Sequence, residues 1–461
     1  MNLTLPSELL QSIANPAGGR VVLVIGAGCS KEAPTNLPLA SECAEEAHRQ
    51  LLADAILNQP SPTPSDLTAI ADLVVEVTGS KRDLVIRLPV QQFRQAEPNE
   101  GHLLAAALLR ERALACVLTL NFDLAMSTAL TRVGSRGDVA IISGPEDHSS
   151  LGLVSLIYLH RNANADPEDW ILTSADLEKA RGAWEKVIAV RVISSPVTVF
   201  AGLGTPSGVL IETVTMIRTP LLEANHVYQV DTVEREDSAF FGRLDLPDEA
   251  YLRMGWIEFM RELAERVVGE LRSELETACN DLIATQGLDS ETVSDLCRKL
   301  TGLGLLNLGK VRARWILDEI DYVERTSDRS IWLADLLLGI SMIERVTDCE
   351  AFFFEDGIVE FRSNSRIVGS LVIAHGRGID RWAVIHQKIR RAERHWRYHN
   401  PKPSVALVSG VLGEQIDMSP PEDIVAEQDP GSIITAGISF EIFSVDQLRQ
   451  DPDLVGRMLD L

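Results

Sequence analysis

Runs of apolar residues alternate with amphipathic stretches along the first half of the chain. Five consecutive apolar residues, Val21 to Ile25, predict a strand that is buried on both faces of a parallel sheet. Further strands are predicted at 115–120, 154–159, 197–201 and 226–230, the last strand of the series. Helices are predicted at 39–57, 66–78, 81–95, 101–113, 122–132, 174–193 and 207–218. This alternation indicates an α/β fold, a parallel sheet with helices on both faces.

The pattern changes in the second half of the chain. Residues 247–345 are predicted to be all-helical, with long amphipathic helices at 254–275 and 330–346. Antiparallel strands follow at 352–354, 359–361 and 367–373, and then a helix at 379–397 and strands at 405–408 and 439–443. The change places a domain boundary near 275, which divides the chain into domains 1–275 and 276–461, the second a helical and α+β region.

Composition narrows the class of protein. The chain has 461 residues, of which 45% are hydrophobic and 24% charged, so a largely disordered chain is excluded. The net charge of −24 repels a phosphate backbone, and direct nucleic-acid binding is therefore not expected. A length of ~150 residues per domain predicts two or three domains.

Six cysteines occur without any C-x-x-C pair, which excludes a zinc ribbon and indicates reduced, buried thiols in a cytoplasmic protein. They are Cys29, Cys43, Cys116, Cys279, Cys297 and Cys349. The first residues show no basic segment followed by an apolar run, and no stretch of ~18 apolar residues occurs, so neither a secretory signal nor a membrane span is expected.

A glycine-containing segment, GAGCS at 26–30, follows the first strand. Its glycines would let backbone N–H groups approach a diphosphate, and the N-terminus of a following helix would add a positive dipole. This is a Rossmann-like arrangement, but the third glycine of G-x-G-x-x-G would fall at Lys31. A tight strand-to-helix turn without a ligand remains the alternative interpretation.

Polar residues also follow the other predicted strands. With Thr119, which lies at the end of its strand, and Gly204, the residues are Asn121, Asp123, His160, Thr205, Ser207 and Asp231. Open α/β sheets bind ligands along the edge formed by the carboxyl ends of their strands, so we expect these residues to gather there. Two alternatives stay open: Asn121 and Asp123 could simply cap the helix at 122–132, and His160 could be a core histidine.

Taken in order, these motifs resemble the sirtuin (SIR2) superfamily. The resemblance covers about residues 15–235 and consists of GAG-x-S at 26–30, Pro-x-x-x-His at 98–102, T-x-N-x-D at 119–123, His160, and Gly-Thr at 204–205. Pro206 precedes Ser207, where the family has serine directly after the threonine. His102 is expected to cap or pack at a helix start rather than to act in catalysis.

Two departures from the sirtuin pattern change the expected activity. No cysteine lies between Cys116 and Cys279, where a deacylase carries its zinc-binding pairs, and residues 35–40 lack the arginine of the deacylase loop. The chain is more similar to the zinc-less SIR2-like proteins of bacterial anti-phage systems, which cleave NAD⁺ to nicotinamide and ADP-ribose. The resemblance therefore implies NAD⁺ as substrate and no metal.

The resemblance also implies roles for individual residues. Asn121 would hold the catalytic water or the nicotinamide ribose, Asp123 would support that pocket, and His160, with an ordinary pKa near ~6.5, would act as general base. The residues expected to bind the rest of the NAD⁺ molecule are Gly26, Ala27, Gly28, Ser30, Thr119, Gly204, Thr205, Ser207 and Asp231.

The resemblance thus implies an NAD⁺ glycohydrolase that acts as a regulated, homo-oligomeric effector of abortive infection. Domain 276–461 would serve sensing, oligomerisation or docking of a partner, such as a HerA-like ATPase or a phage-derived trigger. One alternative is a non-catalytic sensor or scaffold that binds NAD⁺ or ADP-ribose, and another is a remaining deacylase or ADP-ribosyltransferase. The basic run at 388–397 is interpreted as a solvated helix face, and a nuclease site around Glu360 is not favoured because no Glu-x-Lys follows.

Overall fold

The computed structural model divides the chain into two compact units, Met1–Val267 and Val268–Leu461. It describes residues 5–14, 21–133, 139–152, 154–180, 195–204, 211, 215, 225–244, 246–286, 298–299, 302–307, 326–354, 357–375, 389, 405–409, 441–451 and 453–459. The expected boundary near 275 and the division between the units at 267 both fall within one long helix, α12 (Trp256–Gln286).

The first unit contains a seven-stranded sheet in which every pair of neighbours is parallel. Its strands are β1 (Val21–Ile25), β2 (Leu114–Thr119), β3 (Ala140–Ile142), β4 (Ser155–Tyr158), β5 (Val197–Ala201), β6 (His226–Asp231) and β7 (Tyr251–Arg253). Their order is β3-β4-β2-β1-β5-β6-β7, and all five residues of β1 are buried. This confirms the predicted Rossmann-like parallel sheet.

The two edge strands of this sheet were not predicted. β3 and β7 have three residues each, which is too short for a recognisable apolar run. β7 pairs with β6, so the prediction that 226–230 forms the last strand was wrong, as was the all-helical character of 247–345 at this point.

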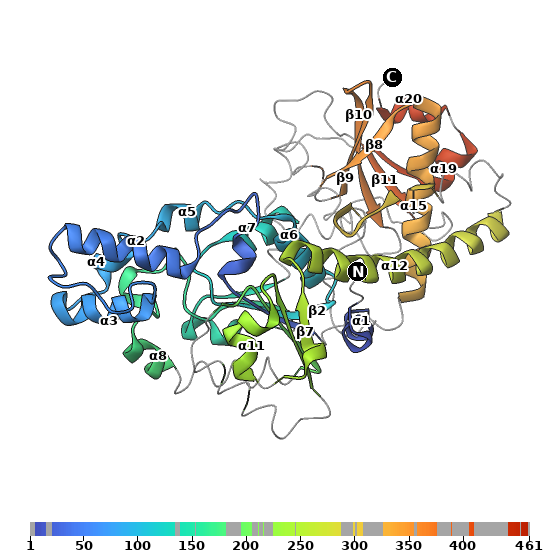
Figure 1. Ribbon diagram of the computed structural model, residues 1–461. Coiled ribbons are helices and arrows are strands. Elements are labelled where there is room, and N and C mark those ends of the chain that lie inside the picture. The colour runs from blue at the N-terminus through green and yellow to red at the C-terminus, as the bar shows by residue number, and fades with distance from the viewer. Residues whose placement is uncertain are drawn as a thin grey trace. The chain divides into compact units, whose positions relative to one another are not determined.

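Helices flank the seven-stranded sheet, and α2 to α5 gather at one side of it (Figure 1). The α-helices are α1 (Ser7–Ile13), α2 (Ala40–Ala53), α3 (Leu67–Thr78), α4 (Arg82–Val85), α5 (Val90–Arg94), α6 (Glu100–Arg110), α7 (Ala125–Arg132), α8 (Ser174–Ala180) and α11 (Ala239–Leu244). Short 3-10 helices are η1 (Ala27–Ser30), η2 (Pro145–Ser150), η3 (Pro167–Asp169), η6 (Arg235–Asp237) and η7 (Asp248–Ala250).

The predicted helix at 81–95 is two short helices instead of one. Pro89 lies between α4 and α5, and a proline inside a helix lacks the N–H donor and restricts the residue before it. The predicted helix at 207–218 and the part of 174–193 beyond α8 fall on residues that the structure mostly leaves undescribed.

The second unit contains a five-stranded mixed sheet of order β12-β11-β10-β9-β8. Its strands are β8 (Glu350–Phe353), β9 (Ile358–Ser363), β10 (Arg366–His375), β11 (Val405–Ser409) and β12 (Glu441–Ser444). β9 is antiparallel to both neighbours, whereas β10, β11 and β12 are mutually parallel.

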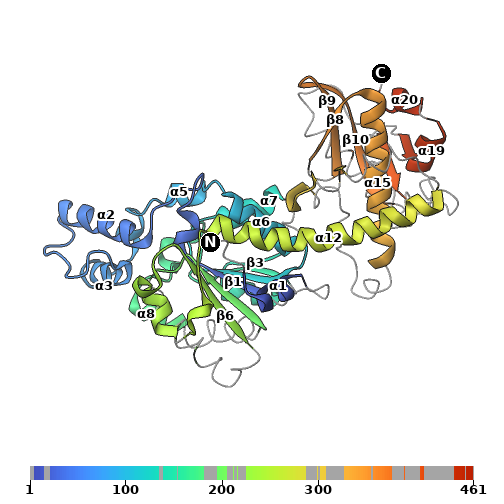
Figure 2. The same ribbon diagram turned by 45° about the vertical axis from the view of Figure 1, so that its right-hand side comes forward.

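Three helices pack beside one another against this sheet: α15 (Thr326–Thr347), α19 (Val445–Gln450) and α20 (Leu454–Leu459) (Figure 2). Apolar residues of the helices and strands, among them Leu337, Phe361 and Leu407, form one buried core. A helical and α+β second region is thereby confirmed, while the predicted helix at 379–397 lies outside the described residues except for Ile389.

The cysteines behave as predicted wherever they are described. Cys29, Cys43, Cys116, Cys279 and Cys349 are buried and form no disulfide, and Cys297 lies outside the described residues. Among the described residues, none of the helices combines the length and the apolar character needed to cross a membrane.

Candidate functional site at the sheet edge

The loops after β1, β2, β4 and β5 start from one edge of the seven-stranded sheet. Hydrogen bonds between neighbouring strands continue into these loops: Gly26 N to Ala201 O (2.9 Å), Leu120 N to Ile25 O (3.0 Å), and Leu159 N to Thr119 O (2.9 Å). Strands that follow β1 in the sequence lie on both sides of it. Such a point of reversed strand order is where open α/β sheets bind ligands.

The glycine loop packs directly on the turn that follows β5. Gly28 N donates to Gly202 O at 2.9 Å, and a Cβ on Gly28 would lie 2.7 Å from the Gly202 Cα. Gly202 has φ of +62°, and a Cβ there would lie 2.5 Å from Cys29 N. Both positions therefore require glycine because two backbones approach closely, which by itself accounts for much of the GAG pattern.

No long helix starts at this loop, which corrects one expectation. The loop forms the 3-10 helix η1, and α2 begins only at Ala40, so α2 does not direct its dipole at residues 26–30. The amides of Gly26, Gly28, Cys29 and Lys31 already donate to backbone carbonyls. Fewer loop amides are thus left for a diphosphate than the motif suggests.

The side chains that follow β1 and β2 form a buried hydrogen-bonded chain. Asn121 Nδ2 donates to Gly26 O at 3.0 Å and to Ser30 Oγ at 3.3 Å. Ser30 Oγ in turn donates to Asp123 Oδ2 at 2.8 Å. All three side chains are buried, Ser30 at 1%, Asp123 at 7% and Asn121 at 9% exposure. Residues from the first and third predicted motifs are thus brought together.

Asp123 has two roles, one for each carboxylate oxygen. Its Oδ1 accepts from Ala125 N at 2.9 Å, and α7 begins at Ala125 rather than at the predicted residue 122. One oxygen thus holds the first amide of α7, although the N-cap residue is Leu124 and has no side-chain cap bond, while the other oxygen binds Ser30. Burial raises the pKa of this carboxyl, and the bonds from Ala125, Ser30 and Asn121 oppose that rise.

His160 lies at the same level in the turn after the neighbouring strand, β4. Thr119 of β2 pairs with Tyr158 of β4, so Asn121 and His160 each follow that pair by two residues. Burial lowers the pKa of His160 to about 4, so the expected ordinary value does not apply and the imidazole is neutral at pH 7. A neutral imidazole can accept a proton, but with less basicity than an exposed histidine.

Those of the remaining predicted residues that the structure describes do not join the hydrogen-bonded chain of the Asn121, Ser30 and Asp123 side chains. Thr119 Oγ1 accepts from Asn121 N at 3.0 Å and so supports the turn after β2. Asp231 Oδ1 accepts from Thr232 N at 2.7 Å at the end of β6, and Ala27 is partly buried. A Cβ added at Gly204 would meet nothing within 4 Å. Thr205 and Ser207 lie outside the described residues. Among the described residues, no group of three or more His, Cys, Asp or Glu side chains could hold a metal ion.

Two residues that sequence reasoning did not select hold the glycine loop in place. Asn99 Nδ2 donates to Cys29 O at 2.9 Å, while its Oδ1 accepts from His102 N at 3.1 Å and begins α6. Glu32 Oε1 accepts from Trp256 N at 2.6 Å and Ile257 N at 3.3 Å at the start of α12. The helix start at 98–102 was a usable signal for Asn99. Glu32 had none, because its partners are more than two hundred residues away.

No protein-family model matches the chain, and no curated protein matches it either. Its structure is similar to solved structures of Sir2 homologues. A mutant Sir2 homologue in complex with ADP-ribose is 18% identical over 58% of this chain and 98% of that chain, with a TM-score of 0.34. A Sir2 homologue–NAD complex is 17% identical over 58% of this chain and 96% of that chain, with a TM-score of 0.33. Sir2 bound to an acetylated peptide is 14% identical over 56% and 96%, with a TM-score of 0.31.

Proposed function

We propose that the chain is an NAD⁺ glycohydrolase, which cleaves NAD⁺ to nicotinamide and ADP-ribose. The hydrogen-bonded chain of Asn121, Ser30 and Asp123 at the strand-order reversal is the observation that carries this proposal. The order of the SIR2-like motifs along the sequence supports it. By the same resemblance, the substrate would lie across the carboxyl ends of β1, β2, β4 and β5.

Asn121 is the residue best placed to hold a reacting group. Its amide Nδ2 donates inward, to Gly26 O and Ser30 Oγ, and this fixes the side chain and leaves Oδ1 as its acceptor. An amide oxygen held in this way can accept a hydrogen bond from the attacking water or from a ribose hydroxyl. A fixed orientation of the water is what hydrolysis of a glycosidic bond needs most.

The reaction requires one bond to break and one to form. The bond between nicotinamide and ribose C1′ breaks, its electron pair leaves with neutral nicotinamide, and positive charge develops on the ribose. Water adds to C1′, and its proton passes to a base, for which neutral His160 is the candidate. A buried carboxylate such as Asp123, in its ionised form, would stabilise the developing charge through a medium of low dielectric constant.

The regulatory part of the proposal concerns the rest of the chain. We assign 1–275 to NAD⁺ processing and 276–461 to sensing, oligomerisation or partner docking in a cytoplasmic anti-phage effector. An enzyme that consumes NAD⁺ must be held inactive until it is triggered, and the second domain is where such a trigger would act.

NAD⁺ loss by the purified full chain, alone and with the product of its genomic neighbour, tests the activity. We expect turnover in the wild type, a loss of at least about 100-fold in Asn121→Ala, and a similar loss in His160→Ala. Asn164→Ala is the matched control, because Asn164 is exposed and lies outside the network. Turnover that survives in Asn121→Ala would contradict the proposed site.

A second candidate is a sensor or scaffold that binds NAD⁺ or ADP-ribose without cleaving it. The lowered pKa of His160 favours it, because a weaker base accepts a proton less readily. Calorimetry separates the two candidates: tight NAD⁺ binding without turnover, alone and with the neighbour, would select the sensor.

A further inference from the structure

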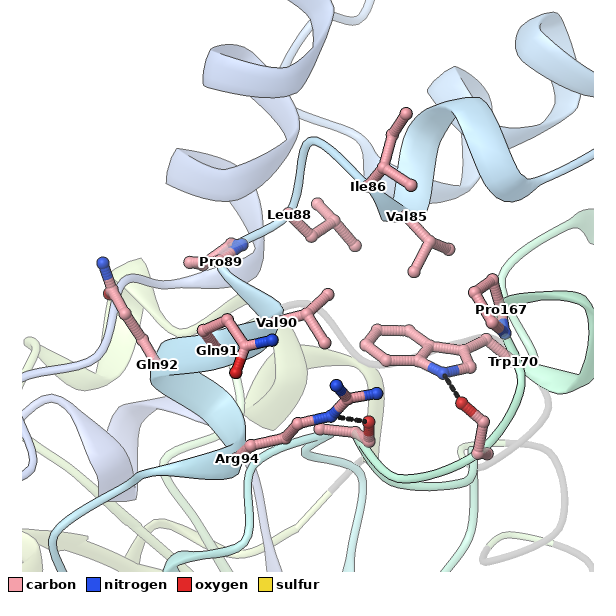
Figure 3. Close-up of a pocket in the computed structure, with 12 residues that line it drawn as sticks. Val85, Ile86, Leu88, Pro89, Val90, Gln91, Gln92, Arg94, Pro167 and Trp170 are labelled. Atoms are coloured by element: carbon pink, nitrogen blue, oxygen red, sulfur yellow. Dashed lines mark hydrogen bonds between the residues drawn. The ribbon is translucent and has the colours of Figure 1, made fainter.

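A pocket of about 430 Å³ lies between α5 and the segment 163–170 (Figure 3). Its apolar lining includes Val85, Leu88, Val90 and the indole of Trp170. Val85, Leu88 and Trp170 are buried side chains of the core that α2 to α5 share. The pocket volume falls within the range of small-molecule sites, about 300–1,000 Å³. None of the predicted NAD⁺-site residues lines it.

One charged side chain lines this pocket, and it is positive. Arg94 Nε donates to Ala163 O at 2.8 Å, which fixes the guanidinium beside the indole of Trp170 (Figure 3). Within the described part of the chain, no carboxylate pairs with Arg94, so its terminal amino groups are available to an anion. Arg94 is exposed, so an anion can reach its guanidinium from solvent while the rest of the molecule enters the pocket.

The pocket wall is joined to the predicted site through Phe122. The Phe122 ring stacks on Trp170 with centroids 4.3 Å apart and planes 16° apart. Phe122 O also accepts from Ala163 N at 2.8 Å. Phe122 lies between Asn121 and Asp123, so a molecule that shifts Trp170 or Ala163 acts on the backbone that carries both residues.

We propose that this pocket binds a small aromatic molecule with one anionic group, the ring against Trp170 and the anion on Arg94. Its effect on the strand-end site would run through Phe122, and that second part rests on the proposed function. The aromatic surface of Trp170 and the single cation of the pocket define this chemical class of ligand. The apolar walls disfavour a strongly hydrated ligand, and Arg94 can bind a carboxylate, sulfonate or phosphate.

Anilinonaphthalene sulfonate, an aromatic anion that fluoresces in apolar surroundings, is a suitable probe for the full chain. We expect Arg94→Gln to raise the dissociation constant of the sulfonate probe by about tenfold or more, because the variant loses a charge-assisted hydrogen bond. Ile86→Asp should weaken probe binding as well, because this side chain lines the pocket and is 63% exposed, so the variant folds. Uncharged phenylnaphthylamine should lose less than about twofold on Arg94→Gln.

Arg49→Gln is the matched control, since Arg49 is an exposed arginine of α2 that does not line the pocket. Sulfonate binding that is unchanged in both pocket variants, or reduced equally in Arg49→Gln, would overturn the binding site. The link to NAD⁺ is measured separately, as the dissociation constant of NAD⁺ with and without saturating probe, and we expect a change of at least about fivefold. An unchanged constant would refute the link but not the pocket, and absence of NAD⁺ binding would refute the proposed function alone.

Discussion

The two sheets of this protein place their buried polar groups differently. In the all-parallel sheet of the first unit, Ser30, Asn121 and Asp123 come from the turns after β1 and β2 and meet at one edge. In the mixed sheet of the second unit, the buried carboxylate of Glu360 lies within β9 itself, at 1% exposure, and binds Arg362 of the same strand.

Strand direction explains the difference. Parallel strands all end on one edge, so short polar turns from distant parts of the sequence become neighbours there. β9 runs against both of its neighbours and therefore ends at the opposite edge, which separates its turn from those of β8 and β10. The parallel sheet of the first unit thus brings polar loop residues together at one edge, whereas the mixed sheet of the second unit keeps its polar pair within a strand.

The largest expected effect comes from adding a Cβ at Gly202, where the turn after β5 packs on the glycine loop of the candidate site. Gly202→Ala should destabilise the first unit by about 4 kcal/mol, because it combines left-handed strain with a clash against Cys29 N. Hydrogen exchange of β1 and β5 amides, followed by mass spectrometry, measures this, while β10 should keep its protection. Gly204→Ala is the control, since a Cβ there meets nothing within 4 Å. Equal losses in both variants would refute the packing argument.

Acid should weaken the first unit through His102. Burial lowers its pKa to about 3, and within the described residues neither ring nitrogen has a hydrogen-bond partner. Below pH ~6.5, His102 binds a proton in the unfolded chain but stays neutral in the folded chain. The free energy of unfolding therefore falls as the pH falls toward 3.

The variant His102→Leu isolates this contribution. Between pH 7.5 and 4.5, the free energy of unfolding of this variant should fall by about 3 kcal/mol less than that of the wild type. The difference arises between the ordinary histidine pKa of ~6.5 and pH 4.5, at about 1.4 kcal/mol per pH unit. The measurement is urea unfolding read from exchange of β2 amides at both pH values. A variant that loses as much as the wild type would show that His102 does not resist protonation.

The smallest of these effects tests the polar pair of the second unit. Arg362→Met should destabilise that unit by about 2 kcal/mol, because Glu360 keeps a buried charge; the cost is below that of a fully buried pair since Arg362 is 35% exposed. Adding Glu360→Gln should restore part of the loss. Exchange of β9 amides reports the change, and NAD⁺ affinity should stay constant. A shift in NAD⁺ affinity instead would mean that the pair is not merely structural.

The sequence predicted the central strands well because they are continuous apolar runs. Residues 21–25 and 197–201 coincide with β1 and β5. It missed β3 and β7, whose three residues are held by neighbouring strands rather than by their own pattern. α7 begins at Ala125 rather than at 122, after a turn in which Asp123 Oδ1 accepts from Ala125 N, and this bond depends on side-chain geometry.

The sequence predicted that residues of the candidate site meet, but it did not predict the pKa of His160. Asn121, Asp123 and Ser30 do meet, as strand ends on one edge should. The lowered pKa of His160 follows from desolvation of its ring by surrounding groups, which no local pattern records. Glu32 and the stacking of Phe122 on Trp170 were equally out of reach, since each joins residues far apart in the chain.

The sequence by itself determined which segments are buried strands, and with them the α/β class and the polar residues at the strand ends, because hydrophobic periodicity is a local property. Only the tertiary structure decided that Gly28 and Gly202 must be glycines to pack against each other, that desolvation lowers the pKa of His160, and that Arg94 and Trp170 share a pocket. These features depend on contacts between segments that are distant in the sequence, and the packing of the whole unit sets their distances and their exposure to water.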